Sequence, residues 1–343
     1  MEYSFIKEIL EAYREKGFFP SASVCIFDKD RTLFTETAGD VTKDTWYDMA
    51  SVSKIVCTTM ILFLMEEGLL TPDSEILTLL PEKELGPVTK TRLAGVTVRQ
   101  IMTHTSGIVP WFPFYSDGRP FYVILERVLS STPKENGMAY SDLNFMLMGL
   151  VFTQLSGLTL REGLEEYIRP ITGDGILYGP VDPAVCAPSC YGNQIEKEMC
   201  AERHLPFYGW RRDGVAVSGS CNDGNAHYYW KGASGHAGIF AQAEALAKLC
   251  RFYMNTEKKY FREAMETDIC ERGLGFDKTV TYPEGCGHSG FTGTSIWFSK
   301  AHNIGAVLLT NKYYRLEGTP GNTNEFRRAV HYALLGKEAP VIL

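Results

Sequence analysis

The stretch Ser51-Val52-Ser53-Lys54 decides how the rest of this sequence is interpreted. It places a serine hydroxyl and a lysine amine three residues apart, at the start of a segment that is predicted to be helical as far as Glu67. Side chains at positions i and i+3 of a helix lie on one face, with Cβ atoms roughly 5–6 Å apart. A desolvated, neutral lysine there takes the proton of the serine and makes its oxygen a useful nucleophile. The spacing alone is common, so the remaining sequence has to support it.

Composition and charge describe an ordinary globular chain. Its 343 residues are 45% apolar and 22% charged, which is ample material for a hydrophobic core. The net charge is −7 and no basic stripe is present, so nucleic acid is not expected as a partner. The nine cysteines include no CxxC pair and no spaced His/Cys set that is typical of zinc sites. We therefore expect reduced, mostly buried thiols, with no metal and no cofactor.

The N-terminal sequence and the hydropathy predict a cytoplasmic protein. Met1 opens directly into an amphipathic helix that Gly17 ends, without the basic start and unbroken apolar stretch of a signal peptide. No run of about 18 apolar residues is available to span a bilayer. Polar and charged residues interrupt the most apolar stretch, Ile55 to Leu70. A membrane partner is therefore not expected.

Strand-like patterns lie at both ends of the chain and helical patterns lie between them. The strands are predicted at 22–27, 32–37, 292–299 and 305–310. The main helices are predicted at 51–67, 97–103, 120–129, 141–155, 160–168, 242–254 and 325–335. This order favours one sheet assembled from both termini plus a helical insertion. We assign residues 1–55 and 235–343 to the sheet domain, and 56–234 to a mainly helical domain with an irregular segment at 171–234.

Tyr140-Ser141-Asp142 is the first further segment with possible chemistry. A tyrosine at a junction between a loop and a helix could share the proton of Ser51 with Lys54. The alternative is helix capping, with Ser141 as the N-cap and Asp142 favourably placed in the first turn. Capping explains the serine and the aspartate but leaves Tyr140 unexplained.

A second segment, rich in small residues, leads into a predicted strand: Gly287-His288-Ser289-Gly290-Phe291-Thr292-Gly293-Thr294. Small residues at this place let a ligand lie against the backbone, where amide N–H groups hold a developing oxyanion. His288 would then supply a polar, titratable edge to the groove. A glycine-rich turn with an exposed histidine is the alternative.

Two other histidines are interpreted as structural. His104, in His104-Thr105-Ser106-Gly107, follows a predicted helix and is expected to cap it or to hold a loop. His236, in Gly235-His236-Ala237-Gly238, is expected to be a loop residue near the site.

Together these motifs resemble those of the serine β-lactamase and penicillin-binding-protein superfamily. The motifs that match in order and approximate spacing are Ser51-x-x-Lys54, His104-Thr105-Ser106-Gly107, Tyr140-Ser141-Asp142 and His288-Ser289-Gly290. The resemblance is greatest to the class C-like branch, and it extends to the loops Ser220–Ala226, Gly235–Phe240 and Ala306–Asn311. It implies an α+β fold in which an antiparallel sheet flanked by helices packs against a helical insertion domain, with the active site between them.

The resemblance also implies a role for each motif. Ser51 would be the acylated nucleophile, Lys54 its general base and Tyr140 a second proton carrier. The backbone N–H groups of Ser51 and Phe291 would form the oxyanion hole. The substrate-binding positions would be Asp142, His288, Ser289 and Gly290.

Two positions depart from the usual family pattern. The tyrosine motif commonly ends in asparagine, whereas here it ends in Asp142. A carboxylate that faced Lys54 would hold the amine charged and weaken it as a base, leaving more of that role to Tyr140. His288 stands where the family has a lysine that can hold a substrate carboxylate. Neutral imidazole offers less charge at pH 7, which favours uncharged acyl substrates.

The sequence thus predicts a serine hydrolase that forms an acyl-enzyme on esters or small amides, acting on a small-molecule acyl substrate. A D-amino-acid peptidase or weak β-lactamase is the alternative within the fold. A non-catalytic penicillin-binding sensor or scaffold is the alternative of another class. An α/β-hydrolase is disfavoured because no G-x-S-x-G elbow is present, the nearest segment being Gly232–His236. The natural substrate and the oligomeric state stay open.

Overall fold

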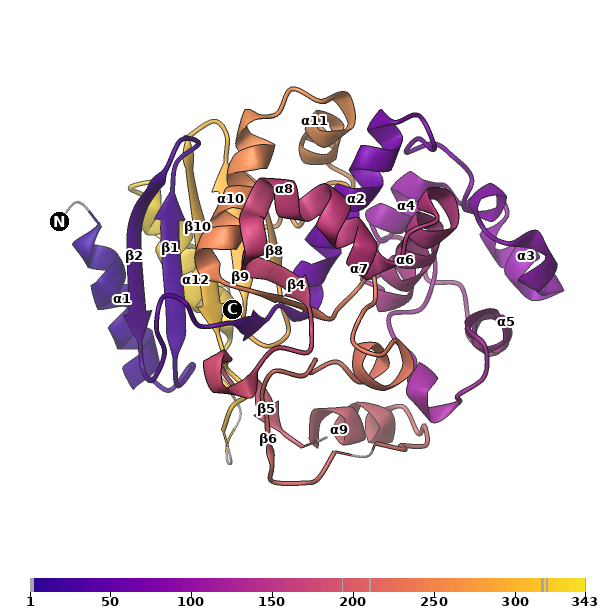
Figure 1. The fold of residues 1–343 in the computed structure, drawn as a ribbon, viewed down its shortest axis with the longest axis horizontal. Coiled ribbons are helices and arrows are strands. Elements are labelled where there is room, and N and C mark those ends of the chain that lie inside the picture. The colour runs from indigo at the N-terminus through magenta and orange to yellow at the C-terminus, as the bar shows by residue number, and fades with distance from the viewer. Residues whose placement is uncertain (1–2, 193, 210, 316–317, 319, 343) are drawn as a thin grey trace.

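The structure is a computed structural model that describes residues 3–192, 194–209, 211–315, 318 and 320–342. A sheet covered by helices lies beside a helical region, and the two chain ends lie on the sheet side (Figure 1). The strands are β1 (Ala22–Phe27), β2 (Thr32–Ala38), β3 (Tyr47–Asp48), β4 (Ile176–Tyr178), β5 (Cys190–Tyr191), β6 (Ala216–Val217), β7 (Ile239–Ala241), β8 (Cys286–Ser289), β9 (Ser295–Ser299) and β10 (Ile304–Thr310). The α-helices are α1 (Ser4–Glu15), α2 (Ser53–Glu66), α3 (Pro87–Leu93), α4 (Val98–Met102), α5 (Phe121–Ser131), α6 (Asp142–Ser156), α7 (Leu160–Gly163), α8 (Arg169–Thr172), α9 (Gln194–Glu202), α10 (Ala243–Asn255), α11 (Lys259–Glu266) and α12 (Thr323–Leu334).

The main sheet has five strands in the order β2-β1-β10-β9-β8, and each neighbouring pair is antiparallel. Its centre joins the two ends of the chain, because β1 pairs with β10 from Ala22–Thr310 to Phe27–Gly305. The predicted fold class, an α+β architecture with an antiparallel sheet flanked by helices, is therefore confirmed.

The side chains of the central strands point in turn to the two faces of the sheet, which explains why helices cover both faces. In β10, Ile304, Ala306 and Leu308 belong to a core shared with α1 and α12. The intervening Val307 and Leu309 belong to the larger core on the opposite face, where α10 packs. Successive side chains of a strand point to opposite faces, so a strand with apolar residues on both faces needs cover on both sides.

Helix α2 runs through the middle of the molecule and is buried on nearly every side. Twelve of its 14 residues are buried, so it lacks the polar face that a surface helix would show. The sequence placed the helix start at Ser51. The structure instead has a short 3₁₀ turn over Ala50–Val52, and the α-helix follows from Ser53.

Two further sequence predictions need correction or detail. The predicted strand 292–299 begins only at Ser295, because residues 290–294 form a turn in which the N–H of Gly290 donates to the carbonyl of Thr294. The segment 171–234 contains short elements, among them β4, β5, β6 and α9, and β4 pairs with β7 from the C-terminal part of the chain.

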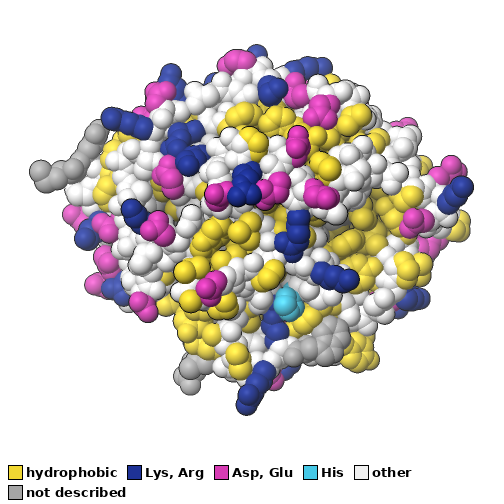
Figure 2. Space-filling view, in the orientation of Figure 1, with side chains coloured by type: hydrophobic (Ala, Val, Ile, Leu, Met, Phe, Trp, Pro, Cys, Tyr) yellow, Lys and Arg dark blue, Asp and Glu magenta, His cyan; other side chains and the backbone are white. Residues whose placement is uncertain are grey.

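All nine cysteines lie within the described residues, where each is a free thiol and all but Cys270 are buried. Over the same residues, no single helix combines the length and the apolar character needed to cross a bilayer. Helix α6 and the segment Leu160–Gly175 meet that criterion only together, and they are bent by 80° relative to each other. On the face shown in Figure 2, basic and acidic side chains are interspersed among apolar ones.

The burial of α2 gives a stability prediction. Leu62 is completely buried in α2, so Leu62→Ala should lower the free energy of unfolding by about 2–5 kcal/mol, through lost burial and a residual cavity. Leu69, just beyond the helix, is 45% exposed, and Leu69→Ala should change it by less than about 0.5 kcal/mol. Urea unfolding of both variants checks this, and equal losses would contradict the central position of α2.

Candidate active site

Ser51 and Lys54 are in direct contact. Lys54 Nζ lies 2.9 Å from Ser51 Oγ, within hydrogen-bond distance. The lysine side chain is completely buried, whereas Ser51 is partly exposed. The 3₁₀ turn holds the serine at the open end of α2, and the first turn of the α-helix holds the lysine beneath it.

The residue before Ser51 has a strained backbone. Ala50 has φ of +44°, in the left-handed region that non-glycine residues rarely adopt. The buried carboxylate of Asp48 supports this conformation, because its Oδ1 accepts the N–H of Ala50 at 2.8 Å and its other oxygen accepts the N–H of Asn222. Burial raises the pKa of Asp48 to about 6, although these two N–H donors act in the opposite direction. Strain of this kind costs of order 1–3 kcal/mol and is concentrated at functional sites.

Tyr140 reaches the same place from the loop before α6, and His104 holds that loop. His104 Nδ1 accepts the N–H of Ser141 at 3.0 Å, and its ring lies 4.4 Å from the ring of Tyr140. The structural interpretation of His104 therefore agrees with its contacts. Ser141 differs from the sequence prediction, since its hydroxyl donates to the carbonyl of Val109 and makes no capping hydrogen bond.

Asp142 faces Lys54, which decides the question that the sequence left open. Its Oδ1 lies 2.7 Å from Lys54 Nζ. Burial lowers the pKa of Lys54, but the charge of Asp142, together with Tyr140 and the hydrogen bonds to both residues, more than offsets it and leaves the pKa raised. Lys54 is therefore a charged ammonium at neutral pH.

The phenol of Tyr140 is also protonated at neutral pH. Burial raises its pKa, the charge of Lys54 lowers it in part, and the charge of Asp142 raises it again. Lys54 Nζ lies 4.9 Å from the centre of the Tyr140 ring. The guanidinium of Arg272 lies 5.5 Å from the centre of the same ring, and no sequence motif indicated a cation at this place.

The predicted strand motif is fastened to the segment that precedes Ser51. In the turn after β8, the hydroxyls of Thr292 and Thr294 donate to the carbonyls of Asp48 and Met49, at 2.8 and 3.0 Å. Gly290 makes this approach possible, because a Cβ at that position would lie 2.3 Å from the Met49 carbonyl oxygen. Phe291, whose N–H was predicted to bind an oxyanion, follows directly in this turn.

His288 is buried, so the alternative of a glycine-rich turn with an exposed histidine is wrong. Its side chain is 3% exposed, and its ring lies 6.1 Å from the ring of Tyr140. Burial, with the charges of Lys54 and Arg272, lowers its pKa well below the usual value, so the ring is neutral at pH 7. The Nδ1–H donates to the carbonyl of Ser289 at 2.8 Å, which leaves Nε2 as an acceptor.

His236, which the sequence analysis interpreted as a loop residue near the site, lies next to the ion pair of Lys54 and Asp142. His236 is buried, and its ring nitrogens contact Ser234 Oγ at 2.7 Å and Asp223 Oδ1 at 2.9 Å. Its carbonyl oxygen accepts from Lys54 Nζ at 3.5 Å. The only sequence signal for this group was the family-like character of the loops 220–226 and 235–240.

Asp142, Asp223 and His236 offer three ligand atoms that all lie within 4.8 Å of one another. Oxygen and imidazole ligands suit several divalent metals. However, the ammonium of Lys54 already lies against Asp142, and the ring of His236 already pairs with Asp223. These three groups are therefore already paired with Lys54 and with one another.

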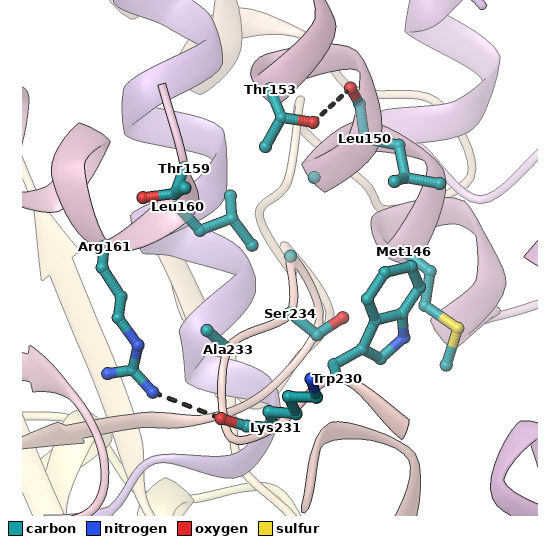
Figure 3. Close-up of a pocket in the computed structure, with 12 residues that line it drawn as sticks. Met146, Leu150, Thr153, Thr159, Leu160, Arg161, Trp230, Lys231, Ala233 and Ser234 are labelled. Atoms are coloured by element: carbon teal, nitrogen blue, oxygen red, sulfur yellow. Dashed lines mark hydrogen bonds between the residues drawn. The ribbon is translucent and has the colours of Figure 1, made fainter. Parts of the chain in front are cut away.

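Ser234 also borders a mainly apolar cavity of about 300 Å³ (Figure 3). Side chains of Met146, Leu150, Leu160 and Trp230 surround the cavity. Its walls come from α6, α7 and the segment 230–235.

Known proteins resemble this chain in sequence and in fold. The family model described as Beta-lactamase matches residues 6–329. An N-acetylmuramyl-L-alanine amidase of Bacillus subtilis (strain 168) is 27% identical over 315 residues, covering 78% of this chain and 68% of the relative. A protein of Escherichia coli (strain K12) assigned as a D-alanyl-D-alanine carboxypeptidase is 26% identical over 331 residues, covering 82% of this chain and 73% of the relative.

A solved structure of a class C β-lactamase superposes with a TM-score of 0.68 at 16% sequence identity, covering 98% of this chain and 99% of that one. At this identity the likeness concerns the fold alone. The family model, in contrast, spans nearly the whole chain. The chain therefore belongs to the β-lactamase family of serine hydrolases, within the superfamily of serine β-lactamases and penicillin-binding proteins.

Proposed function

We propose that this serine hydrolase forms an acyl-enzyme at Ser51 and acts on esters or small amides. The observation that carries the proposal is the 2.9 Å contact between the partly exposed Ser51 hydroxyl and the fully buried Lys54 amine. A hydroxyl in contact with a buried proton carrier is the arrangement that nucleophilic catalysis requires.

In the proposed reaction, Ser51 Oγ attacks the acyl carbon and its proton passes to a neighbouring side chain. Because Asp142 holds Lys54 charged, Tyr140 takes the larger share of the base role. The reactive form is the Tyr140 phenolate, which the ammonium of Lys54 stabilises, and it becomes a phenol when it accepts the proton of Ser51. The leaving group then receives this proton. Water then attacks the acyl carbon and gives a proton to the Tyr140 phenolate. This proton passes to Ser51 Oγ as the bond between Oγ and the acyl carbon breaks, which releases the acid and restores the serine. The N–H groups of Ser51 and Phe291 hold the oxyanion in both steps.

The alternative within the fold is a D-amino-acid peptidase or weak β-lactamase. The names of the two relatives, an amidase and a carboxypeptidase, favour amide substrates over esters. The neutral, buried His288 favours acyl substrates without a carboxylate, because the strand motif lacks its usual cation. A non-catalytic sensor would need neither Lys54 nor Tyr140 beside Ser51, so we place it behind both.

The first test is acylation of Ser51. After exposure to an activated ester, and separately to a penicillin, intact-mass analysis should show one adduct per chain, and Ser51→Ala should show none. Ser130→Ala, which alters a serine on the exposed end of α5, should retain the adduct. A full-stoichiometry adduct on Ser51→Ala would falsify the assignment of the nucleophile.

The second test concerns the charge of Asp142. A general base acts in its deprotonated form, so the acylation rate should rise with pH through the pKa of the base. Asp142 raises the pKa of both Lys54 and Tyr140, so Asp142→Asn should move this rise to lower pH, whichever of the two is the base. The measurement is the pH profile of single-turnover acylation.

Asp213→Asn is the control for that test, because Asp213 is an exposed partner of Lys197. Its profile should match that of the unaltered protein. A profile of Asp142→Asn that stays in place or moves to higher pH would show that Asp142 does not set the proton affinity of the base.

The third test concerns His288. His288→Lys should shift the preference towards a carboxylate-bearing β-lactam over a neutral ester by about tenfold, or ~1.4 kcal/mol. His302→Lys adds the same charge at a more exposed position and should leave the preference unchanged. The ratio of the two kcat/KM values is the readout, and an unchanged ratio in His288→Lys would refute the charge argument.

A further inference from the structure

Besides its interaction with Tyr140, the ammonium of Lys54 lies within hydrogen-bond distance of three acceptor oxygens in the described part of the chain. They are Ser51 Oγ at 2.9 Å, Asp142 Oδ1 at 2.7 Å and the carbonyl oxygen of His236 at 3.5 Å. A neutral amine keeps two N–H groups and gains a lone pair. If Asp142 and His236 hold those two N–H groups, the lone pair points at Ser51. The same three groups can therefore hydrogen-bond to Lys54 both as an ammonium and as a neutral amine.

The carbonyl of His236 belongs to a backbone that is fixed on two sides. Gly235 packs so closely on α6 that a Cβ there would lie 2.1 Å from the carbonyl oxygen of Phe145. On the other side, the ring of His236 is held between Ser234 Oγ and Asp223 Oδ1. The ring thus determines how the peptide of its own residue is oriented towards Lys54.

We propose that Asp223 and His236 are positioning residues of this active site, which hold the His236 carbonyl against Lys54 and place a second carboxylate beside the Lys54–Asp142 pair. This inference rests on the proposed function, because the direction of the Lys54 side chain matters for the reaction only if Lys54 assists the removal of the Ser51 proton. Neither Asp223 nor His236 touches the reacting atoms, so they act through Lys54.

The ionisation of the pair supports this role. Burial raises the pKa of Asp223, but the interaction with His236, the N–H of Ala226 and the charge of Lys54 outweigh it and leave the pKa lowered. Asp223 is therefore a carboxylate at neutral pH, and the Nε2 of His236 donates to it. The remaining nitrogen, Nδ1, then accepts the Ser234 hydroxyl whenever the ring is neutral.

The second carboxylate also acts on the charge of Lys54. Interaction between the two charges is mutual, so Asp223 favours the ammonium form of Lys54 as Lys54 favours the carboxylate form of Asp223. The other ionisable groups that face Lys54 are Asp142, Tyr140, His104, His288 and Cys57. Both of these histidines are neutral because burial lowers their pKa values, which leaves the two aspartates as the negative charges.

The experiment measures single-turnover acylation by an activated ester in Asp223→Asn and His236→Gln. Each variant should lose about 10- to 100-fold in the maximal acylation rate, the size expected when a reacting group is misplaced by about 1 Å. The half-saturating ester concentration should change by less than about threefold, because neither residue binds substrate. In Asp223→Asn the rise of the rate with pH should also move to lower pH, since a negative charge is removed.

Two further variants separate positioning from general stability. Glu196→Gln removes another buried carboxyl, which accepts the N–H of Gly224 at 2.7 Å in the same loop but does not touch Lys54. It should keep both the acylation rate and the pH profile. Asp223→Glu retains the charge and should recover at least a third of the lost rate. Thermal unfolding midpoints are measured for all four variants.

The outcomes distinguish this inference from the proposed function. If the unaltered protein forms no adduct at Ser51, the proposed function fails. If the adduct forms and Asp223→Asn and His236→Gln react as fast as the unaltered protein, the positioning role is overturned. A rate loss equal to that of Glu196→Gln, with an unshifted pH profile and lowered midpoints, would likewise overturn it by showing that the loop only stabilises the fold.

Discussion

The buried ammonium of Lys54 is the constraint on which the rest of this site depends. Removing an unpaired charge from water costs several kcal/mol, so a completely buried lysine needs a counter-charge and an acceptor for each N–H. Asp142 supplies the counter-charge, and Ser51 and His236 supply the remaining acceptors. Lys54, the side chain next to the serine hydroxyl, is thus also the one that the surrounding segments contact.

These segments are distant in sequence, and the fold brings them together at the end of α2. The antiparallel sheet places the turn 290–294 beside the strained Ala50, and the hydroxyls of Thr292 and Thr294 fasten it there. Helix α6 begins at Asp142 and also provides the surface on which Gly235 packs. One helix therefore sets the distance between two of the three acceptors of Lys54.

Features that depend on local spacing could be predicted from the sequence. The surroundings of individual side chains could not, because they depend on which residues pack together in the folded protein. The contact of Ser51 with Lys54 follows from positions i and i+3, and the strands β1 and β10 follow from their apolar runs. The burial of His288 could not be predicted in this way, because its surroundings include residues far away in the chain, such as Tyr140. His236 looked like a loop residue for the same reason, since its partner Asp223 and its contact with Lys54 exist only in the folded protein.

Position 142 is an aspartate, where the family commonly has asparagine. The aspartate makes Lys54 a weaker base but holds its side chain in place more firmly. An asparagine oxygen would also accept from Lys54, but it would leave the pKa of the amine to burial, which lowers it. The carboxylate fixes the amine more firmly and keeps it charged, so the step that removes the proton of Ser51 becomes harder. A charged Lys54 next to Tyr140 lowers the pKa of the phenol, which partly offsets this effect. The departure at position 142 therefore moves the burden of proton transfer from the lysine towards the tyrosine, and it makes the groups that orient both side chains as important as the two side chains themselves.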